Sequence, residues 1–474
     1  MKLLSATTLL VLASAAIAGD HGTLVPAKPE PKANPLSFLD GALVLDVEER
    51  VRFEARNNTR DFNDSINDDN DDTWLLNRFR FGLAVRPARW LKLYAQFQDV
   101  REWDSDRPNV PGVRGTEGGD SDLRQGYVEL ANYEAFPLGL TVGRQSFFYG
   151  DGRLIGDPRW NNFGRTFDAV KLRFQTKAFW LDAFASRPVQ MKEEVFNDRD
   201  AADNLFGLYG GTEALGFQTT ELYFFYRDKG DAQPDLDPTN KLDPRGTWNG
   251  PAQRIATVGT RWQSQKGGLH GWDYTVEAAF QWGDVWTPDR STPALDHHAF
   301  AAHVSGGYTF EKLTWHPRIG LEYDYASGDR DPADGRSESF QNLLASNHEK
   351  YGYMDEFAWR NLHDFRVQLK VDVIKDVQAE LNYHALWLAD TNDYWFRSNG
   401  VSTVRTTTPD GRDVRRIGAD RFAGHELDFV VKWFPAKWLQ VDAGYSHFFA
   451  GDYLGDTGTR DDADFGYVQA TVKF

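Results

Sequence analysis

From about Leu43 onward, the sequence runs in segments of about ten residues in which apolar and polar side chains alternate. Successive side chains of a β-strand point to opposite faces, so each segment predicts a strand with one apolar and one polar face. In one clear example, Val367, Leu369, Val371 and Val373 alternate with Arg366, Gln368, Lys370 and Asp372. A soluble sandwich shows the same alternation, so this pattern by itself predicts an all-β chain and no more.

The lengths of the connections between the segments distinguish a transmembrane barrel from a soluble sandwich. Some are very short, at 87–88, 136–137, 375–376 and 435–436. The others are long and mostly acidic, at 57–72, 102–121, 149–165, 188–203, 229–252, 284–296, 328–360, 391–419 and 451–463. Transmembrane barrels have tight turns at one membrane face and long loops at the other, whereas a sandwich has no reason for this alternation. We therefore predict a transmembrane antiparallel up-and-down β-barrel.

The strand count is constrained by parity. Seventeen strands are obvious in the sequence, but a barrel with both chain ends on one side needs an even number. Residues 204–210 form a plausible further strand, with its turn near 212–216. We expect about eighteen strands, a size at which porin barrels enclose an aqueous channel.

Composition agrees with a membrane wall and excludes several functions. Mean hydropathy is -0.57 although aromatic residues reach 14%, a mixture typical of a wall with one lipid face and one wet face. The absence of cysteine excludes disulfides, zinc–thiolate sites and a cysteine nucleophile. A net charge of -17 argues against nucleic acid as a partner.

The N-terminus predicts export. Lys2, the apolar run 3–12 and Ala16-Ile17-Ala18 match a signal peptide over residues 1–18, with Gly19 as the first mature residue. The proline-rich residues 19–40 predict a disordered periplasmic leader, and 41–474 the barrel. No other run approaches the ~18 apolar residues of a membrane helix. We expect the mature chain in the outer membrane of a Gram-negative-type cell, in contact with lipid and lipopolysaccharide.

The C-terminus ends in a strand that finishes on Phe474. Alternating apolar residues that finish on a terminal aromatic resemble the recognition signal of the outer-membrane assembly machinery, which we therefore expect as a partner.

Three groups of motifs resemble the alginate export porin family, and the likeness runs from about Leu43 to Phe474. The first group is Leu140-Thr141-Val142-Gly143-Arg144-Gln145 with 150–153 and 160–170; the second is 204–210 with 222–227; the third is 327–332 with 339–343 and 347–355. The resemblance implies an eighteen-stranded barrel whose basic lumen passes an acidic polysaccharide, without cofactor or catalysis.

Such a lumen needs cations, because a guanidinium pairs with a uronate carboxylate through two hydrogen bonds. Lys171 and Arg173 alternate with Val170 and Leu172, so they are expected to face the water inside the barrel. The predicted substrate path comprises Arg78, Arg80, Arg144, Arg153, Arg159, Arg165, Lys171 and Arg173, with Arg50, Arg52 and Arg366 as secondary candidates.

The alternative role for these cations is structural. Porin lumens hold arginine–carboxylate pairs that brace inward loops, and partners are available at Glu48, Glu54, Asp168 and Asp182. The glycine- and aromatic-rich loop 149–165 is a candidate for an inward loop.

Other sites and functions are less favoured. Acidic residues crowd the first long loop, which we interpret as solvated rather than as a calcium site. His297 and His298 point to opposite faces of one strand, so they form a poor metal pair and no metal is expected. The alternatives are a porin for other solutes, a barrel enzyme and an exported β-protein outside the membrane. An enzyme would need a nucleophile or carboxylate arrangement, and no such motif is present.

Overall fold

The computed structural model describes residues 36–65, 71–105, 120–190, 196–230, 252–265, 269–286 and 294–474. Within them, one sheet contains 21 strands. Three of these have only two residues: β1 (Ser37–Phe38), β9 (Asp198–Arg199) and β16 (Arg336–Ser337). The remaining eighteen form the wall, as the sequence predicts.

The wall strands follow one another in chain order. They are β2 (Leu43–Asn57), β3 (Asp72–Ala88), β4 (Leu91–Trp103), β5 (Asp120–Ala131), β6 (Leu138–Gln145), β7 (Phe167–Gln175), β8 (Phe179–Gln190), β10 (Asp203–Thr212), β11 (Gln218–Lys229), β12 (Gln253–Ser264), β13 (Trp272–Val285), β14 (Leu295–Thr309), β15 (Arg318–Ala326), β17 (Leu362–Ile374), β18 (Val377–Trp387), β19 (Phe422–Ala436), β20 (Leu439–Ala450) and β21 (Ala463–Lys473).

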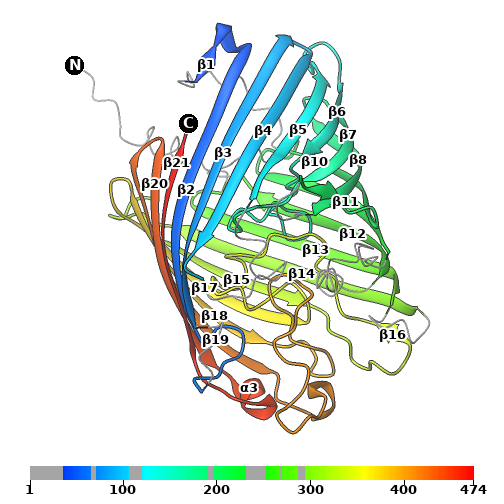
Figure 1. The fold of residues 1–474 in the computed structure, drawn as a ribbon, viewed down its shortest axis with the longest axis vertical. Helices are drawn as coiled ribbons and strands as arrows, with labels where there is room; N and C mark the ends of the chain where they lie inside the picture. The colour runs from blue at the N-terminus through cyan, green and yellow to red at the C-terminus, as the bar shows by residue number, and fades with distance from the viewer. Residues whose placement is uncertain are drawn as a thin grey trace.

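Each wall strand pairs antiparallel with the next, and the last pairs with the first. The closing contact joins β2 to β21, with Val51 opposite Ala470 (Figure 1). The strand predicted over 204–210 is confirmed as β10, which pairs with β8 on one side and β11 on the other. The all-β, antiparallel, closed barrel is therefore confirmed.

Because side chains alternate along each strand, the wall has an apolar outer face and a polar inner face. On β7, Val170 and Leu172 are 49% and 43% exposed, as expected of side chains that face lipid. Lys171 and Arg173 alternate with them and point inward, where each cation lies beside an aromatic ring. His297 is fully buried inside the barrel while the neighbouring His298 is exposed, which confirms that the two residues point to opposite faces.

The two ends of the barrel differ. Tight hairpins such as 375–376 lie at the end where β21 finishes, and the long loops lie at the other end beside the short helix α3 (Asp452–Thr457) (Figure 1). Two further short helices are η1 (Leu39–Gly41) and η2 (Val414–Arg416). In the part of the chain that the structure describes, no helix has the length and apolar character needed to cross a membrane.

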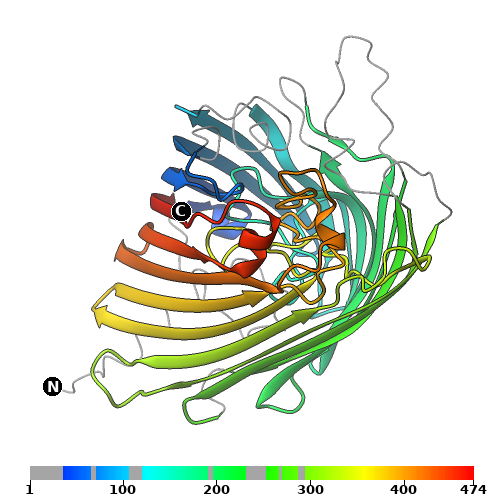
Figure 2. The same ribbon diagram turned by 90° about the horizontal axis from the view of Figure 1, so that it is seen from below.

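Several long loops fold into the barrel instead of standing away from it. Seen from the loop end, the segments 327–361 and 388–421 gather inside the ring of strands (Figure 2). Their aromatic residues join inward side chains of the wall in one buried cluster that includes Phe340, Tyr353, Trp359, Trp395, Phe167, Tyr209 and Phe448. The loop-side half of the barrel is therefore filled with packed protein.

The N-terminal boundary is described only in part. The predicted signal peptide and residues 19–35 lie outside the described residues. The end of the predicted leader is ordered, because Ser37 pairs with Val44 and Phe38 with Leu43. Regular pairing therefore begins a few residues before the predicted barrel start.

Candidate functional site

The loop between β6 and β7 crosses the interior and is held by arginines of the wall. Arg50 and Arg78 each donate to the carbonyl of Arg159, at 2.8 and 3.0 Å. Arg52 donates to the carbonyl of Trp160 at 2.6 Å, and Arg80 to that of Phe163 at 3.1 Å. Because strands β2 and β3 project these side chains inward at every second residue, they form a row of donors along the loop. The expected inward fold of 149–165 is confirmed.

All four carboxylates that the sequence offers as partners pair with arginine. The distances are 2.6 Å for Arg78–Glu48, 2.6 Å for Arg52–Glu54, 2.8 Å for Arg144–Asp168 and 2.8 Å for Arg173–Asp182. A guanidinium that is already bonded to a carboxylate offers fewer donors to a passing solute. The pairs of Arg52, Arg78 and Arg173 agree with the structural role.

Arg153 anchors the inward loop to the opposite wall. Its guanidinium lies 2.9 Å from Asp324 and 2.8 Å from Glu322 on β15, and it donates to the Tyr351 hydroxyl at 3.0 Å. His303, Glu322 and Asp324 form the one group of described residues whose ligand atoms, all within 4.8 Å of one another, have metal-site spacing. Arg153 already supplies positive charge there, so the group is a buried ion cluster.

Arg165 ties two inward loops together. It donates to the carbonyls of Gly156, Leu344 and Ala345, and thereby joins the β6–β7 loop to segment 327–361. Its own backbone NH donates to Asp157 at 2.7 Å. Burial acts to raise the pKa of Asp157, but the nearby cations Arg124 and Arg80 outweigh it and lower that pKa to about 2.

The prediction that Arg144 lines the lumen does not fit its place on β6. Arg144 shares a face with Val142, which is 43% exposed, and it stands opposite Asp168, which shares a face with exposed Val170. The Arg144–Asp168 pair therefore lies on the outer face of the wall. The alternation in 140–145 already contained this signal, since Leu140, Val142 and Arg144 have the same parity.

Three of the eight predicted cations have no carboxylate partner in the described parts of the chain. One is Arg165, whose guanidinium is bonded to backbone carbonyls; the other two are Lys171 and Arg159. The Lys171 ammonium points inward, 5.8 Å from the centre of the Phe147 ring. Arg159, in the inward loop, is exposed, and its guanidinium lies 4.7 Å from the centre of the Phe148 ring. Charges held against aromatic faces keep their positive sign toward water.

The inner wall is electrostatically uneven. Nine Arg and Lys side chains of the described residues are buried, and five of them lie on β2, β3 and β5, namely Arg50, Arg52, Arg78, Arg80 and Arg124. The wall strands of the far side, from β13 to β20, have no buried Arg or Lys among their described residues but six buried carboxylates, namely Glu277, Asp324, Asp364, Glu426, Asp428 and Asp442. Sequence reasoning missed this second group, because it treated the acidic inner residues only as partners for arginines. We call the strands β2–β7, which also carry Lys171 and Arg173, the basic wall.

A closed antiparallel barrel of this size, with an apolar outer face and a charged interior, defines the porin class of membrane protein. The chain belongs to the alginate export family, whose family model matches residues 42–468. Family and fold together indicate a channel in the outer membrane.

Solved structures give the same fold at low sequence identity. OccK9 (OpdG) of Pseudomonas aeruginosa has a TM-score of 0.58 and 11% identity, covering 91% of this chain and 98% of its own. OccK11 (OpdR) of the same organism has a TM-score of 0.55 and 11% identity, covering 91% and 96%. OpdK, solved with vanillate, has a TM-score of 0.55 and 10% identity, covering 91% and 98%. A comparison with curated proteins gives no match.

Proposed function

We propose that the protein is a passive outer-membrane channel for acidic oligosaccharides or polysaccharides of the alginate type, which move along the basic wall. The observation that carries the proposal is the pair of inward cations, Lys171 and Arg159, that bond no carboxylate in the described residues. Arg78, Arg80, Arg153, Arg165 and Arg173 support the path by fixing the loops beside it. Arg144 is left out of the path.

The electrostatics favour such a solute. A uronate polymer carries one carboxylate on each sugar, and cations in a narrow low-dielectric passage raise the local concentration of anions. The basic wall and the acidic far side create a field across the lumen, which draws a carboxylate toward β2–β7. An acidic sugar is therefore attracted toward one side of the passage.

Block of single-channel current by oligouronates tests this proposal. Lys171→Gln removes one inward charge, so we expect the affinity for block to fall roughly three- to tenfold. Arg144→Gln is the matched control, because it removes one charge from the outer face, and its block should equal that of the wild type. Equal block in all three proteins, or equal loss in both variants, would contradict the proposed path.

A second candidate is a channel for small carboxylated solutes. The packed inward loops favour it, because a polymer needs more room than a small anion. The similar barrel OpdK was solved with vanillate, a small carboxylate. Uptake into liposomes separates the two candidates: entry of monouronate with exclusion of all longer oligouronates favours the second, and entry of both favours the first.

Targeting follows from the same proposal. We propose that residues 1–18 are removed as a signal peptide on export and that Phe474 is read by the assembly machinery. Lipid and lipopolysaccharide would then cover the outer face, where side chains such as Val170 and Leu172 are exposed.

A further inference from the structure

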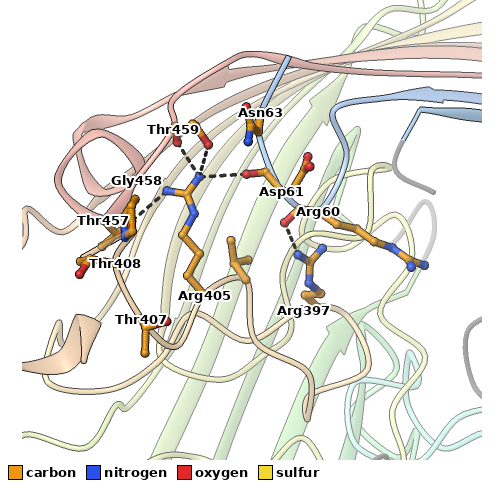
Figure 3. A pocket seen from close by; sticks show the side chains of 12 residues that line it. Arg60, Asp61, Asn63, Arg397, Arg405, Thr407, Thr408, Thr457, Gly458 and Thr459 are labelled. Atoms are coloured by element: carbon orange, nitrogen blue, oxygen red, sulfur yellow. Dashed lines mark hydrogen bonds between the residues drawn. The ribbon is translucent and has the colours of Figure 1, made fainter. Parts of the chain in front are cut away.

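A polar pocket of about 550 Å³ lies among the loops at the outer end of the barrel. Three loops enclose it: 60–63 between β2 and β3, 397–409 between β18 and β19, and 457–459 between β20 and β21 (Figure 3). Its volume lies in the range of small-molecule sites. We call it the outer pocket.

Arg405 joins the three loops at this pocket. Its guanidinium donates to the carbonyls of Leu454, Asp61 and Thr459 and to the hydroxyls of Thr457 and Thr459 (Figure 3). Every one of these acceptors is a neutral oxygen, so no carboxylate in the described residues is bonded to this cation. Burial holds the pKa of Arg405 below its usual value, because the surrounding charges do not replace the lost water.

Arg397 binds the same loops from the other side. It pairs with Glu356 at 2.9 Å and donates to the carbonyl of Arg60. With Arg60, the lining formed by the described residues contains three cations, of which Arg397 is paired with Glu356, against one carboxylate, Asp61. In a chain with a net charge of -17, this is a local reversal of sign at the outer mouth.

The uncharged part of the lining resembles a surface for hydroxylated ligands. Thr407 and Thr459 line the pocket with exposed side chains, and its apolar contribution comes from Val404 and Pro409. Thr408 and Thr457 also line it, but they are buried and their hydroxyls donate to Asp410 and to the Tyr453 carbonyl. The Thr407 side chain is exposed and forms no hydrogen bond with another described residue. The lining includes no aromatic side chain, so it offers no stacking surface to an aromatic acid.

We propose that the outer pocket is a docking site for an acidic saccharide at the outer mouth of the lumen. The carboxylate is attracted by the charges of Arg405, Arg397 and Arg60, and the sugar hydroxyls bond to the exposed Thr407 and Thr459. The substrate class rests on the proposed function, whereas the site is a separate one.

Binding of an oligouronate to the purified full-length protein in detergent tests the site. Thr407→Glu places a negative charge in the pocket and leaves the bonds of Arg405 intact, so we expect affinity to fall about tenfold. The matched control is Thr406→Glu, because Thr406 is also exposed but does not line the pocket. It should bind as the wild type does, and a neutral oligosaccharide of equal length should bind far more weakly.

Current block in a bilayer distinguishes failure of this site from failure of the lumen path. If Thr407→Glu and Thr406→Glu bind oligouronate equally, or if the neutral sugar binds as well, the outer pocket is not the site. Suppose that oligouronate added on the hairpin side blocks the wild-type current, but Thr407→Glu does not change oligouronate binding. That result overturns the outer pocket and leaves the lumen path intact. If Thr407→Glu weakens oligouronate binding, the pocket is supported, even when oligouronate does not block the current. In that case only the lumen path is contradicted.

Discussion

Arg153 connects parts of the chain that lie far apart in sequence. It reaches from the β6–β7 loop to Asp324 and Glu322 on β15 and to Tyr351 in the loop that follows. Asp324 also contacts His303 at 3.0 Å, so the Arg153 guanidinium and the His303 imidazole both lie against this buried carboxylate. Removing it would leave carboxylates without their cation, which is the costly way to break a buried ion pair.

Arg153→Met should therefore loosen the inward loop. We expect a local cost of about 3–5 kcal/mol, a lower melting temperature of the barrel in detergent and larger, noisier single-channel currents. Asp324→Asn added to Arg153→Met should recover part of the stability, because it removes one of the orphaned charges. A single variant that melts and conducts as the wild type does would show that Arg153 does not hold the loop.

At the scale of single residues, alternation along the strand predicted that Lys171 and Arg173 point inward. This was possible because the side to which a side chain points follows from its position within one strand. The same rule places Arg144 outside, and the lumen assignment failed there because it followed a motif instead of the parity. The Arg153–Asp324 pair spans 171 residues and depends on how a loop folds back. No local pattern contains that information.

The two largest described inward loops place two acidic residues, Asp329 and Asp393, close together. The backbone NH of Asp329 donates to the Asp393 carboxylate at 3.1 Å, so segments 327–361 and 388–421 meet at two acids. Burial, followed by the neighbouring Asp393, raises the pKa of Asp329 to about 7 from its ordinary 3.8. The packed arrangement thus favours the protonated acid.

The contact between these loops should weaken as pH rises. A raised carboxyl pKa stabilises the packed loops fully below about 3.8, and that contribution falls as pH rises through about 7. Hydrogen exchange of 388–421 should therefore be faster at pH 8 than at pH 5, after correction for the intrinsic exchange rate, and Asp329→Asn should remove this difference. Asp331→Asn, on an exposed neighbour, should retain it. Corrected exchange that does not depend on pH in the wild type would contradict the assignment.

The wall strands were predictable because their alternating pattern repeats along the sequence. Parity of the strand count predicted β10 from the sequence alone, and the alternation of short and long connections identified the two ends of the barrel. The inward path of 327–361 and 388–421 was not predictable, because aromatic residues such as Trp359 and Trp395 resemble ordinary loop residues until a wall surrounds them. The outer pocket was not predictable either, because it is formed by three loops that lie far apart in the sequence.

The closed ladder determines how the whole molecule behaves in solution. Every wall strand is paired on both sides, so unfolding must open many hydrogen bonds together. We predict that the protein is extracted from membranes only by detergent and migrates differently on gels before and after heating. Release by salt or alkali alone, with identical migration of heated and unheated samples, would contradict a membrane-spanning barrel.

The zero-current potential of single channels, measured in a planar bilayer under a salt gradient, tests the proposed basic passage most directly. We predict anion preference, because inward cations without carboxylate partners in the described residues line the path on the basic wall. Lys171→Gln should reduce that preference, whereas Arg144→Gln should leave it unchanged. Cation preference in the wild type would leave the barrel intact but contradict a channel for acidic saccharides.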